Sequence, residues 1–539
     1  MHEARPLDPA GPRPSWDPRF QPCIPTVTTL GATAHHSLCG LFAQADDLAA
    51  LDCASPGETV AVIEYLLAIC FASGTCPASD EDWRTWIRSQ RSLAPASDWL
   101  ERQPADAWDL FHLAQPLAQN SQLAADLRES GTGTAQLVIE HAGDYNQHFD
   151  HHHLALDNPL PAADAFRATL TQHVYGPYGR ARMSGERLGA KVTNLAAGRL
   201  TGRIRVVVLG RTLGETLRLN LYPPDGPGEP LNTSWTAAGF ERRTFTEKAK
   251  PRVPRSSADL HSSLGRSVLL RPARGPYGQV MVDRVLIGAG EVLDLDPTRH
   301  LQDAVYSKTT NGVSKPLWPS PSRALWQQAH ALYSAVMDDR TGMYARLRSL
   351  ISSEIPYERT GPGAPYQLWA VGLLANKTLP VIWTHGAYPY APGMEAHLYR
   401  ASRRGSVVAE YIAYVLKSAA IVAAETAFPA MRAADESGQV ARLDARYAFW
   451  PAAEDPFHEL LDEVIDRGFT DDDDPVSAPL VAYALELMTT ARTQLLQRLD
   501  TLPPNDRNHR ARARGVRLFE EAMSGERAPA ELRGETAVD

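Results

Sequence analysis

The sequence predicts an α+β protein: a large mixed α/β domain over residues 1–390, followed by a C-terminal four-helix bundle over residues 391–539. Helical patterns lie between residues 58 and 127, and strand-like runs follow between residues 202 and 293. After about residue 396, the strong apolar patterns all have the three-or-four spacing of amphipathic helices. The chain of 539 residues is long enough for roughly two to four domains with sizeable cores.

The elements of the mixed domain follow from local patterns. A helical stripe covers Glu58–Phe71 after a Ser-Pro-Gly start signal, and shorter helical patterns continue over Asp80–Leu127. Residues Gly202–Leu221 predict a β-rich stretch, RIRVVVLG and then RTLGETLRLNLY, and the next run, PPDGPGEPLN, predicts a loop. Arg266–Leu293 holds two strand patterns separated by ARGPYG, which predicts a hairpin.

Four amphipathic patterns predict the bundle. The first runs from Val408 to Val422 and the second from Phe457 to Ile465, with Gly468 at the position expected for a C-terminal cap. The third runs from Val481 to Leu499, and the segment RARARGVRLFEEAM provides a weaker fourth. Four such helices joined by polar loops are typical of a bundle.

Composition places the chain among ordinary globular proteins, with 44% hydrophobic and 22% charged residues. The longest apolar stretch, Val407–Phe428, is interrupted by charged residues, and the N-terminus lacks the apolar core of a signal peptide. All five cysteines lie in the first 76 residues without CxxC spacing, which favours buried free thiols in a reducing compartment. We therefore expect a soluble cytoplasmic protein without membrane contact.

The net charge of −9 hides an uneven distribution. Residues 1–165 carry a charge of −14, whereas residues 166–211 hold nine basic side chains and only Glu186 as an acid. Such a basic segment is typical of contact with nucleic-acid phosphates. The alternative is a solvated face whose cations pair with the acidic N-terminal residues.

Within that basic segment, the run HVYGPYGRAR has the features of a nucleic-acid-binding loop. Gly176 and Gly179 would allow close approach of the backbone to a phosphate or groove, and Pro177 stiffens the turn. Tyr178 offers a stacking face, and two cations, Arg180 and Arg182, follow at once. The other interpretation of this short pattern is a surface turn.

A histidine-rich run, HAGDYNQHFDHHH, begins at His141 and contains the ligand types that zinc prefers. It supports an alternative hypothesis, a metal-dependent hydrolase using His141, His148 and His151. The run lacks HExxH, however, and the chain lacks a Walker A, a GxSxG and a strand-linked GxGxxG sequence. The acidic run Asp471–Asp474 predicts a solvated loop. We therefore expect no catalytic residues, no metal and no cofactor.

The order of short motifs resembles the large subunit of the type I-E CRISPR surveillance complex Cascade, the CasA family, over nearly the whole chain. The best single match is GRTLGETLRLNL, which is similar to the family's Gly-x-Thr-Leu-x-x-Thr-Leu-x-x-Asn run. The other matching runs, in chain order, are PCIPTV, DLFHLAQPLAQ, HAGDYNQHFDHHH, SRALW and RYAFW. The resemblance also accounts for the histidine-rich run without a metal.

The resemblance implies a non-enzymatic subunit that inspects the protospacer-adjacent motif of double-stranded DNA, largely from the minor groove, and helps to open the duplex. Its implied partners are the other Cascade protein subunits, the CRISPR guide RNA, the target DNA, and an effector helicase-nuclease or an alternative recruited effector. A purely architectural subunit without DNA contact is the remaining alternative.

The resemblance also implies site residues. The family's glycine loop matches Gly176 and Gly179, and its strand-separating wedge, on a turn after a Gly-containing helix, aligns with GLLANKTLP. Asn376 and Lys377 then stand at the wedge tip, with Lys377 where well-known members have glutamine. Candidates for the family's minor-groove lysine are Arg274, Arg299 and Lys308.

Overall fold

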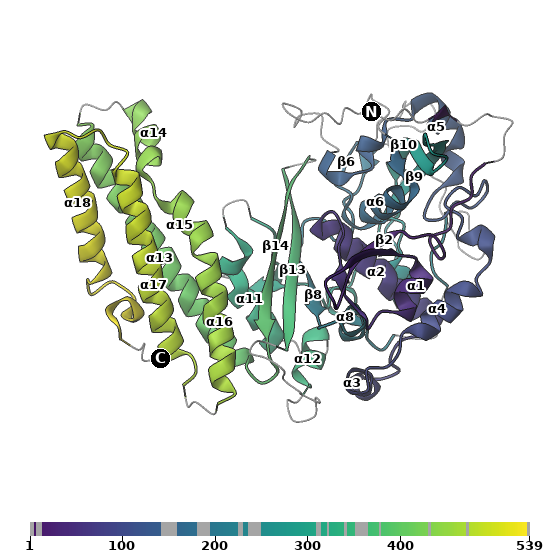
Figure 1. The fold of residues 1–539 in the computed structure, drawn as a ribbon, viewed down its shortest axis with the longest axis horizontal. Helices are drawn as coiled ribbons and strands as arrows, with labels where there is room; N and C mark the ends of the chain where they lie inside the picture. Colours follow the sequence, from purple (N-terminus) through teal and green to yellow (C-terminus); the bar gives the residue numbers. More distant parts are fainter. Residues whose placement is uncertain are drawn as a thin grey trace. The chain divides into compact units, whose positions relative to one another are not determined.

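The computed structural model divides the chain into two compact units, which we describe separately (Figure 1). Unit 1 consists of Met1–Ser322, Asp339–Pro356 and Leu368–Ala387, and unit 2 of Arg323–Asp338, Tyr357–Gln367 and Tyr388–Asp539. The structure describes residues 5–6, 13–141, 159–180, 194–224, 230–235, 250–308, 314–320, 323–338, 342–350, 365–376, 379–429, 433–470 and 474–535. The predicted fold class, a mixed α/β region followed by a helical bundle, is confirmed.

A long buried helix, α2 (Pro56–Ser73), forms the centre of unit 1. Its N-cap is Ser55, whose side chain accepts a hydrogen bond from the Glu58 amide, and its C-cap is Gly74 in the left-handed conformation. Its residues are buried on every side from Val60 to Phe71, as expected for a helix that is apolar all round. The helix predicted over Glu58–Phe71 is therefore confirmed.

Small elements surround α2 in unit 1. A three-stranded sheet has the order β3-β2-β4, and the short helices α1 and α4 pack together beside it. The bounds of the elements before residue 162 are β1 (Arg5–Pro6), β2 (Ile24–Thr28), β3 (Thr33–His36), α1 (Leu38–Ala43), β4 (Leu48–Leu51), α3 (Asp80–Arg88), α4 (Ala94–Glu101), α5 (Ala124–Ser130) and β5 (Leu160–Pro161). Three of these helices, α3, α4 and α5, lie where short helical patterns were predicted.

The predicted hairpin is confirmed as β9 (Arg266–Arg274) and β10 (Val280–Ala289). The two strands pair antiparallel, with Leu270 opposite Val285, and form the middle of a sheet with the order β1-β9-β10-β5. The inward side chains Val268, Leu270, Val282 and Val285 join the same core as α2. Alternation of apolar residues is sufficient to specify such a pair.

One strand expectation is wrong. RIRVVVLG forms β8 (Arg205–Leu209), but the next run forms a helix, α8 (Leu213–Asn220), instead of a strand. The Thr212 hydroxyl accepts a hydrogen bond from the Glu215 amide, and the Glu215 carboxylate accepts one from the Arg211 amide. This capping arrangement starts a helix, and Leu213 and Leu217 are then buried one turn apart.

The expected helix before the wedge tip is also wrong. The described residues of GLLANKTLP lie in two paired strands, β13 (Tyr366–Asn376) and β14 (Leu379–Tyr390), and β13 pairs with β8. Burial alternates along residues 366–370, which is the period of a strand. Gly372 serves close packing here, because a Cβ at this position would lie 2.6 Å from Pro319 Cγ.

The remaining unit 1 elements connect these pieces. They are α6 (Ala162–Tyr175), β6 (Gly179–Arg180), β7 (Asn194–Leu195), α9 (Ser257–His261), α10 (Pro297–His300), β11 (Tyr306–Lys308), β12 (Ser314–Pro316) and α12 (Met343–Arg348). The α2 helix packs against both α6 and α9. The free thiols of Cys23, Cys39 and Cys70 are buried, and burial raises the pKa of Cys23 to about 12.

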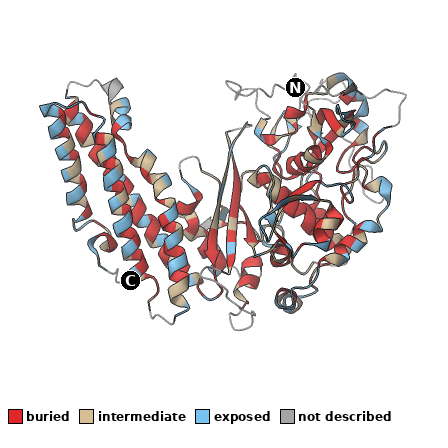
Figure 2. Cartoon of the chain, viewed as in Figure 1, coloured by how far each residue is buried: buried red, intermediate tan, exposed pale blue. Residues whose placement is uncertain are grey.

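Unit 2 contains the predicted four-helix bundle. The helices are α13 (Glu395–Ala427), α16 (Glu454–Gly468), α17 (Ser477–Leu499) and α18 (Asp506–Met523), and α13 packs against the other three. Figure 2 shows buried residues along one side of these helices and exposed residues along the other. The unit also contains α11 (Ala329–Asp338), α14 (Ala433–Leu443) and α15 (Arg446–Ala452).

The expected role of Gly468 as a helix cap is wrong. Gly468 is the last residue of α16, and the cap position is taken by Phe469. A Cβ on Gly468 would lie 2.2 Å from Met394 Cε, so close packing explains the glycine.

Two described helices, α2 and α13, are long and apolar enough to cross a bilayer by length and composition alone. Both are largely buried within their units, which is the pattern of core helices in a globular protein.

Candidate nucleic-acid interface

The glycine loop, defined here as residues Gly176–Arg180, follows directly on the buried helix α6. The Gly176 amide donates a hydrogen bond to Gln172 O at 3.0 Å, which completes the last turn of that helix. The Gly176 carbonyl accepts hydrogen bonds from the Gly198 amide at 2.8 Å and from Thr201 Oγ1 at 3.3 Å. These contacts hold the backbone at the start of the loop.

Glycine is required at position 176 because of close packing. Its φ of −49° is open to other residues. A Cβ there would lie 2.6 Å from both Arg266 Nε and Gln172 O. Any side chain would therefore displace either the helix end or the arginine that packs on the loop.

Arg266 is a functional candidate that the sequence analysis missed. Its side chain is 1% exposed, and Nη2 donates to Pro177 O while Nη1 donates to Ala196 O, each at 2.6 Å. Burial lowers the pKa of Arg266 to about 10. The residue thus links the loop backbone at Pro177 to the backbone that follows β7 at Ala196, and no local signal in strand β9 predicts this role.

The far end of the loop is held by a short β ladder and presents side chains to solvent. Gly179 pairs with Leu195 and Arg180 with Asn194, as strands β6 and β7. Tyr178 is 46% exposed, and Arg180 is also exposed. The loop therefore offers an aromatic ring and a cation from an anchored backbone, a combination that suits contact with a nucleic acid. Arg182 lies outside the described residues.

Most of the other described cations of the basic segment are buried. Arg167 forms ion pairs with Glu58 and Asp164. The remaining buried cations are Arg199, Arg203 and Arg205, which pair with Glu64 and Asp303. The pairing with N-terminal acids that the alternative predicted is therefore present, at Glu58, Glu64 and Asp164. The predicted solvated face is wrong for these four cations, because they are buried, and Asp303 is an additional partner from outside the N-terminal residues. Among the described cations of the basic segment, only Arg180 and Arg211 are exposed and so remain candidates for phosphate contact.

The other predicted contact residues are spread over unit 1. Asn376 is the last residue of β13, and Lys377 lies outside the described residues. Arg274 stands at the hairpin end of β9, whereas Arg266 stands at its other end, roughly 26 Å away along an extended strand. The last two candidates, Arg299 and Lys308, lie in α10 and β11. Arg274 and the glycine loop therefore lie near opposite ends of β9.

The metal hypothesis gains no support. Two of its three ligands, His148 and His151, lie outside the described residues, and His141 ends a short 3₁₀ helix. Within the described part of the chain, no group of three His, Cys, Asp or Glu side chains could hold a metal ion.

Comparison with solved structures identifies the class of fold as that of CRISPR-associated proteins. Cse1 from Acidimicrobium ferrooxidans matches with a TM-score of 0.74 and 19% identity, over 98% of this chain and 100% of that chain. Cse1 from Thermobifida fusca matches with a TM-score of 0.70 and 18% identity, over 97% and 99% of the two chains. A chain of a structure titled CRISPR RNA-guided surveillance complex matches with a TM-score of 0.65 and 21% identity, over 94% and 100%.

The sequence itself identifies the family. The family described as CRISPR-associated protein Cse1 matches residues 20–494, and the chain belongs to this family. No curated protein sequence matches the chain. A matching solved structure from Thermus thermophilus is described as CasA (Cse1), so both names refer to one family, and the resemblance to CasA drawn from short motifs is confirmed.

Proposed function

We propose that this protein is the non-catalytic large subunit of an RNA-guided CRISPR surveillance complex and that it recognises the protospacer-adjacent motif of double-stranded DNA. Its partners would be the other protein subunits, the guide RNA, the target DNA and a helicase-nuclease or alternative effector, all in the cytoplasm. Family membership and the match to a surveillance-complex chain support the assembly.

The anchored glycine loop is the observation that supports DNA recognition. Its backbone is held by Arg266 and by the β6–β7 ladder, while Tyr178 and Arg180 face solvent. A loop of this kind can approach the minor groove closely, where the degenerate pattern of donors and acceptors suits a permissive reader. The hairpin end at Asn376 is the proposed site of duplex opening, because an inserted wedge can offset the cost of unstacking a base step.

Binding of the assembled, guide-loaded complex to a matched duplex tests the proposal. We expect Tyr178→Ala combined with Arg180→Ala to weaken binding by roughly tenfold or more and to lower the slope of log K against log salt by about one. Arg102→Ala, an exposed arginine at the end of α4, is the matched control. Equal binding by the double variant and the control would overturn the role of the loop.

The hairpin end is tested separately. In a duplex with a pre-opened bubble next to the motif, Asn376→Ala combined with Lys377→Ala should bind like the parent complex, whereas binding to the closed duplex should weaken. Equal loss on both substrates would show that these residues bind DNA without opening it.

A further inference from the structure

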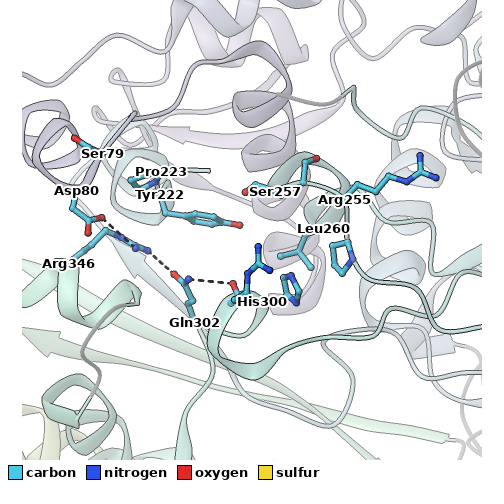
Figure 3. A pocket seen from close by; sticks show the side chains of 13 residues that line it. Ser79, Asp80, Tyr222, Pro223, Arg255, Ser257, Leu260, His300, Gln302 and Arg346 are labelled. Atoms are coloured by element: carbon cyan, nitrogen blue, oxygen red, sulfur yellow. Dashed lines mark hydrogen bonds and ion pairs between the residues drawn. The ribbon is translucent and has the colours of Figure 1, made fainter. Parts of the chain in front are cut away.

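A polar cavity of about 280 Å³ lies in unit 1 (Figure 3). Three arginines line it, Arg255, Arg299 and Arg346, whereas Asp80 is its single carboxylate. No residue of the glycine loop contributes to its wall. The volume is close to the lower end of the range for small-molecule sites.

A smaller cavity of about 30 Å³ continues from the floor of the first. The two share lining residues that include Tyr222, Arg299, Gln302 and Arg346. Arg199, Arg205 and Asp303 line only the deeper part. The combined wall therefore carries five arginines and two carboxylates.

The guanidinium groups on the floor belong to an arginine cluster, defined here as Arg199, Arg203 and Arg205 with the acids Glu64 and Asp303. Glu64 accepts ion pairs from Arg199 and Arg205, and Asp303 accepts them from Arg203 and Arg205. Three buried guanidinium groups thus form ion pairs with only two carboxylates. The cluster therefore carries one positive charge in excess. Arg199 Nε has no hydrogen-bond partner among the described residues.

The neighbouring histidine adds no charge to this cluster. Burial and the nearby Arg199 and Arg205 push the pKa of His261 well below its usual value, so the ring is neutral. Its Nδ1–H donates to Glu64 Oε2 at 2.6 Å, and its Nε2 accepts from the Tyr222 hydroxyl at 3.2 Å. Burial and the adjacent arginines Arg203 and Arg205 also lower the pKa of Arg199, to about 9. A buried excess of cations is costly unless an anion offsets it.

The cavity wall is already ordered. Arg346 is 7% exposed and lies over the Tyr222 ring at 5.6 Å. Its Nη2 donates to Gln302 Oε1 at 3.1 Å, and Gln302 Nε2 donates to Arg299 O at 3.4 Å. Figure 3 shows Arg346 between Asp80 and Gln302. Gln302 and Asp80 thus hold the Arg346 guanidinium in place, with Nη1 at 3.9 Å from Asp80 Oδ1. A guanidinium group can bind two oxygens of an oxyanion at once.

We propose that this cavity binds the phosphate group of a small molecule, either inorganic phosphate or a phosphomonoester. The excess of guanidinium groups over carboxylates around the cavity suits an anion, and paired guanidinium donors suit the several oxygens of a phosphate. Arg346 and Arg299 hold the oxygens at the mouth, and Arg199 directs positive charge from the floor.

The test uses the full chain, with inorganic phosphate and glycerol 3-phosphate as probes and sodium chloride at equal ionic strength as the blank. Both phosphates should raise the Tm relative to chloride, and titration followed by ³¹P NMR should show saturable binding. Arg346→Gln and Arg299→Gln should each weaken phosphate binding by roughly tenfold or more. The exposed Arg102→Gln is the control.

Equal binding by both variants and the control, or equal Tm shifts in phosphate and chloride, would overturn the proposal. Because Arg346 is buried, its variant is checked by circular dichroism, and the exposed Arg299 variant keeps the test decisive if Arg346→Gln does not fold. A 5′-phosphorylated oligonucleotide that binds at the cavity when both small phosphates fail would assign the site to a nucleic-acid end and overturn the small-molecule proposal.

Discussion

The glycine loop and the arginine cluster come from the same basic segment but differ in where their cations lie. Arg180 of the loop is exposed on a short ladder, whereas Arg205 of the cluster is 3% exposed and pairs with Glu64 and Asp303. The exposed cation is available for a salt-sensitive contact with a partner. The buried cations instead contribute to folding and to the cavity floor. The distribution of charge along a sequence therefore does not show whether a cation contacts a partner or forms a buried ion pair.

The largest expected effect comes from removing the acid at the centre of the cluster. Glu64 is fully buried and accepts contacts from Arg199, Arg205 and His261. Glu64→Ala leaves guanidinium groups buried without this partner, and it should lower the free energy of unfolding by about 3–5 kcal/mol. Urea denaturation measures this change. Glu101→Ala, at an exposed acid of α4, should change it by less than about 0.5 kcal/mol.

Gly176→Ala tests whether the loop is as tightly packed as the cluster. The added Cβ would meet Arg266 and Gln172 O, so we expect a loss of about 1–3 kcal/mol in unfolding free energy. DNA binding by the assembled complex should weaken as well. Gly438→Ala, in α14 with open space around it, is the control and should be neutral or stabilising. A neutral Gly176→Ala would show that the loop adapts to a side chain.

The dependence of stability on pH distinguishes the two regions. Because the folded pKa of His261 is lowered, the unfolded chain binds a proton near pH 6.5 that the folded chain does not bind. Stability should therefore fall as pH falls below about 6.5, with His261 contributing up to about 1.4 kcal/mol per pH unit.

Denaturant titrations between pH 7 and pH 5 measure this slope. His261→Gln should reduce it, and His385→Gln, at an exposed site outside the cluster, is the control. An unchanged slope in His261→Gln would contradict the neutral state of this ring.

Arg180→Ala should have the smallest effect on stability, less than about 0.5 kcal/mol, because its side chain is exposed. The substitution should instead affect DNA binding, by reducing the slope of log K against log salt. A large loss of stability would place Arg180 with the buried cations and remove the contrast between the two regions.

Local patterns predicted the elements whose periodicity is uninterrupted. The helix over Glu58–Phe71, the β9–β10 hairpin and the bundle were predicted because their apolar spacing repeats over many residues. The run RTLGETLRLNLY was misassigned because its β-like leucine and threonine content concealed a cap at Thr212. For the candidate site, Gly176 and Tyr178 were predicted from the sequence and stay predictions, whereas Arg266 had no local signal.

The sequence by itself determined the family, the fold class and the position of the glycine loop, since short motifs and repeated spacings are properties of neighbouring residues. Only the tertiary structure decided which cations are buried and that Arg266 holds the loop. Arg205 and Glu64 are 141 positions apart, and Arg266 and Pro177 are 89 apart. Burial and ion pairing depend on such distant partners, which only the folded chain brings together.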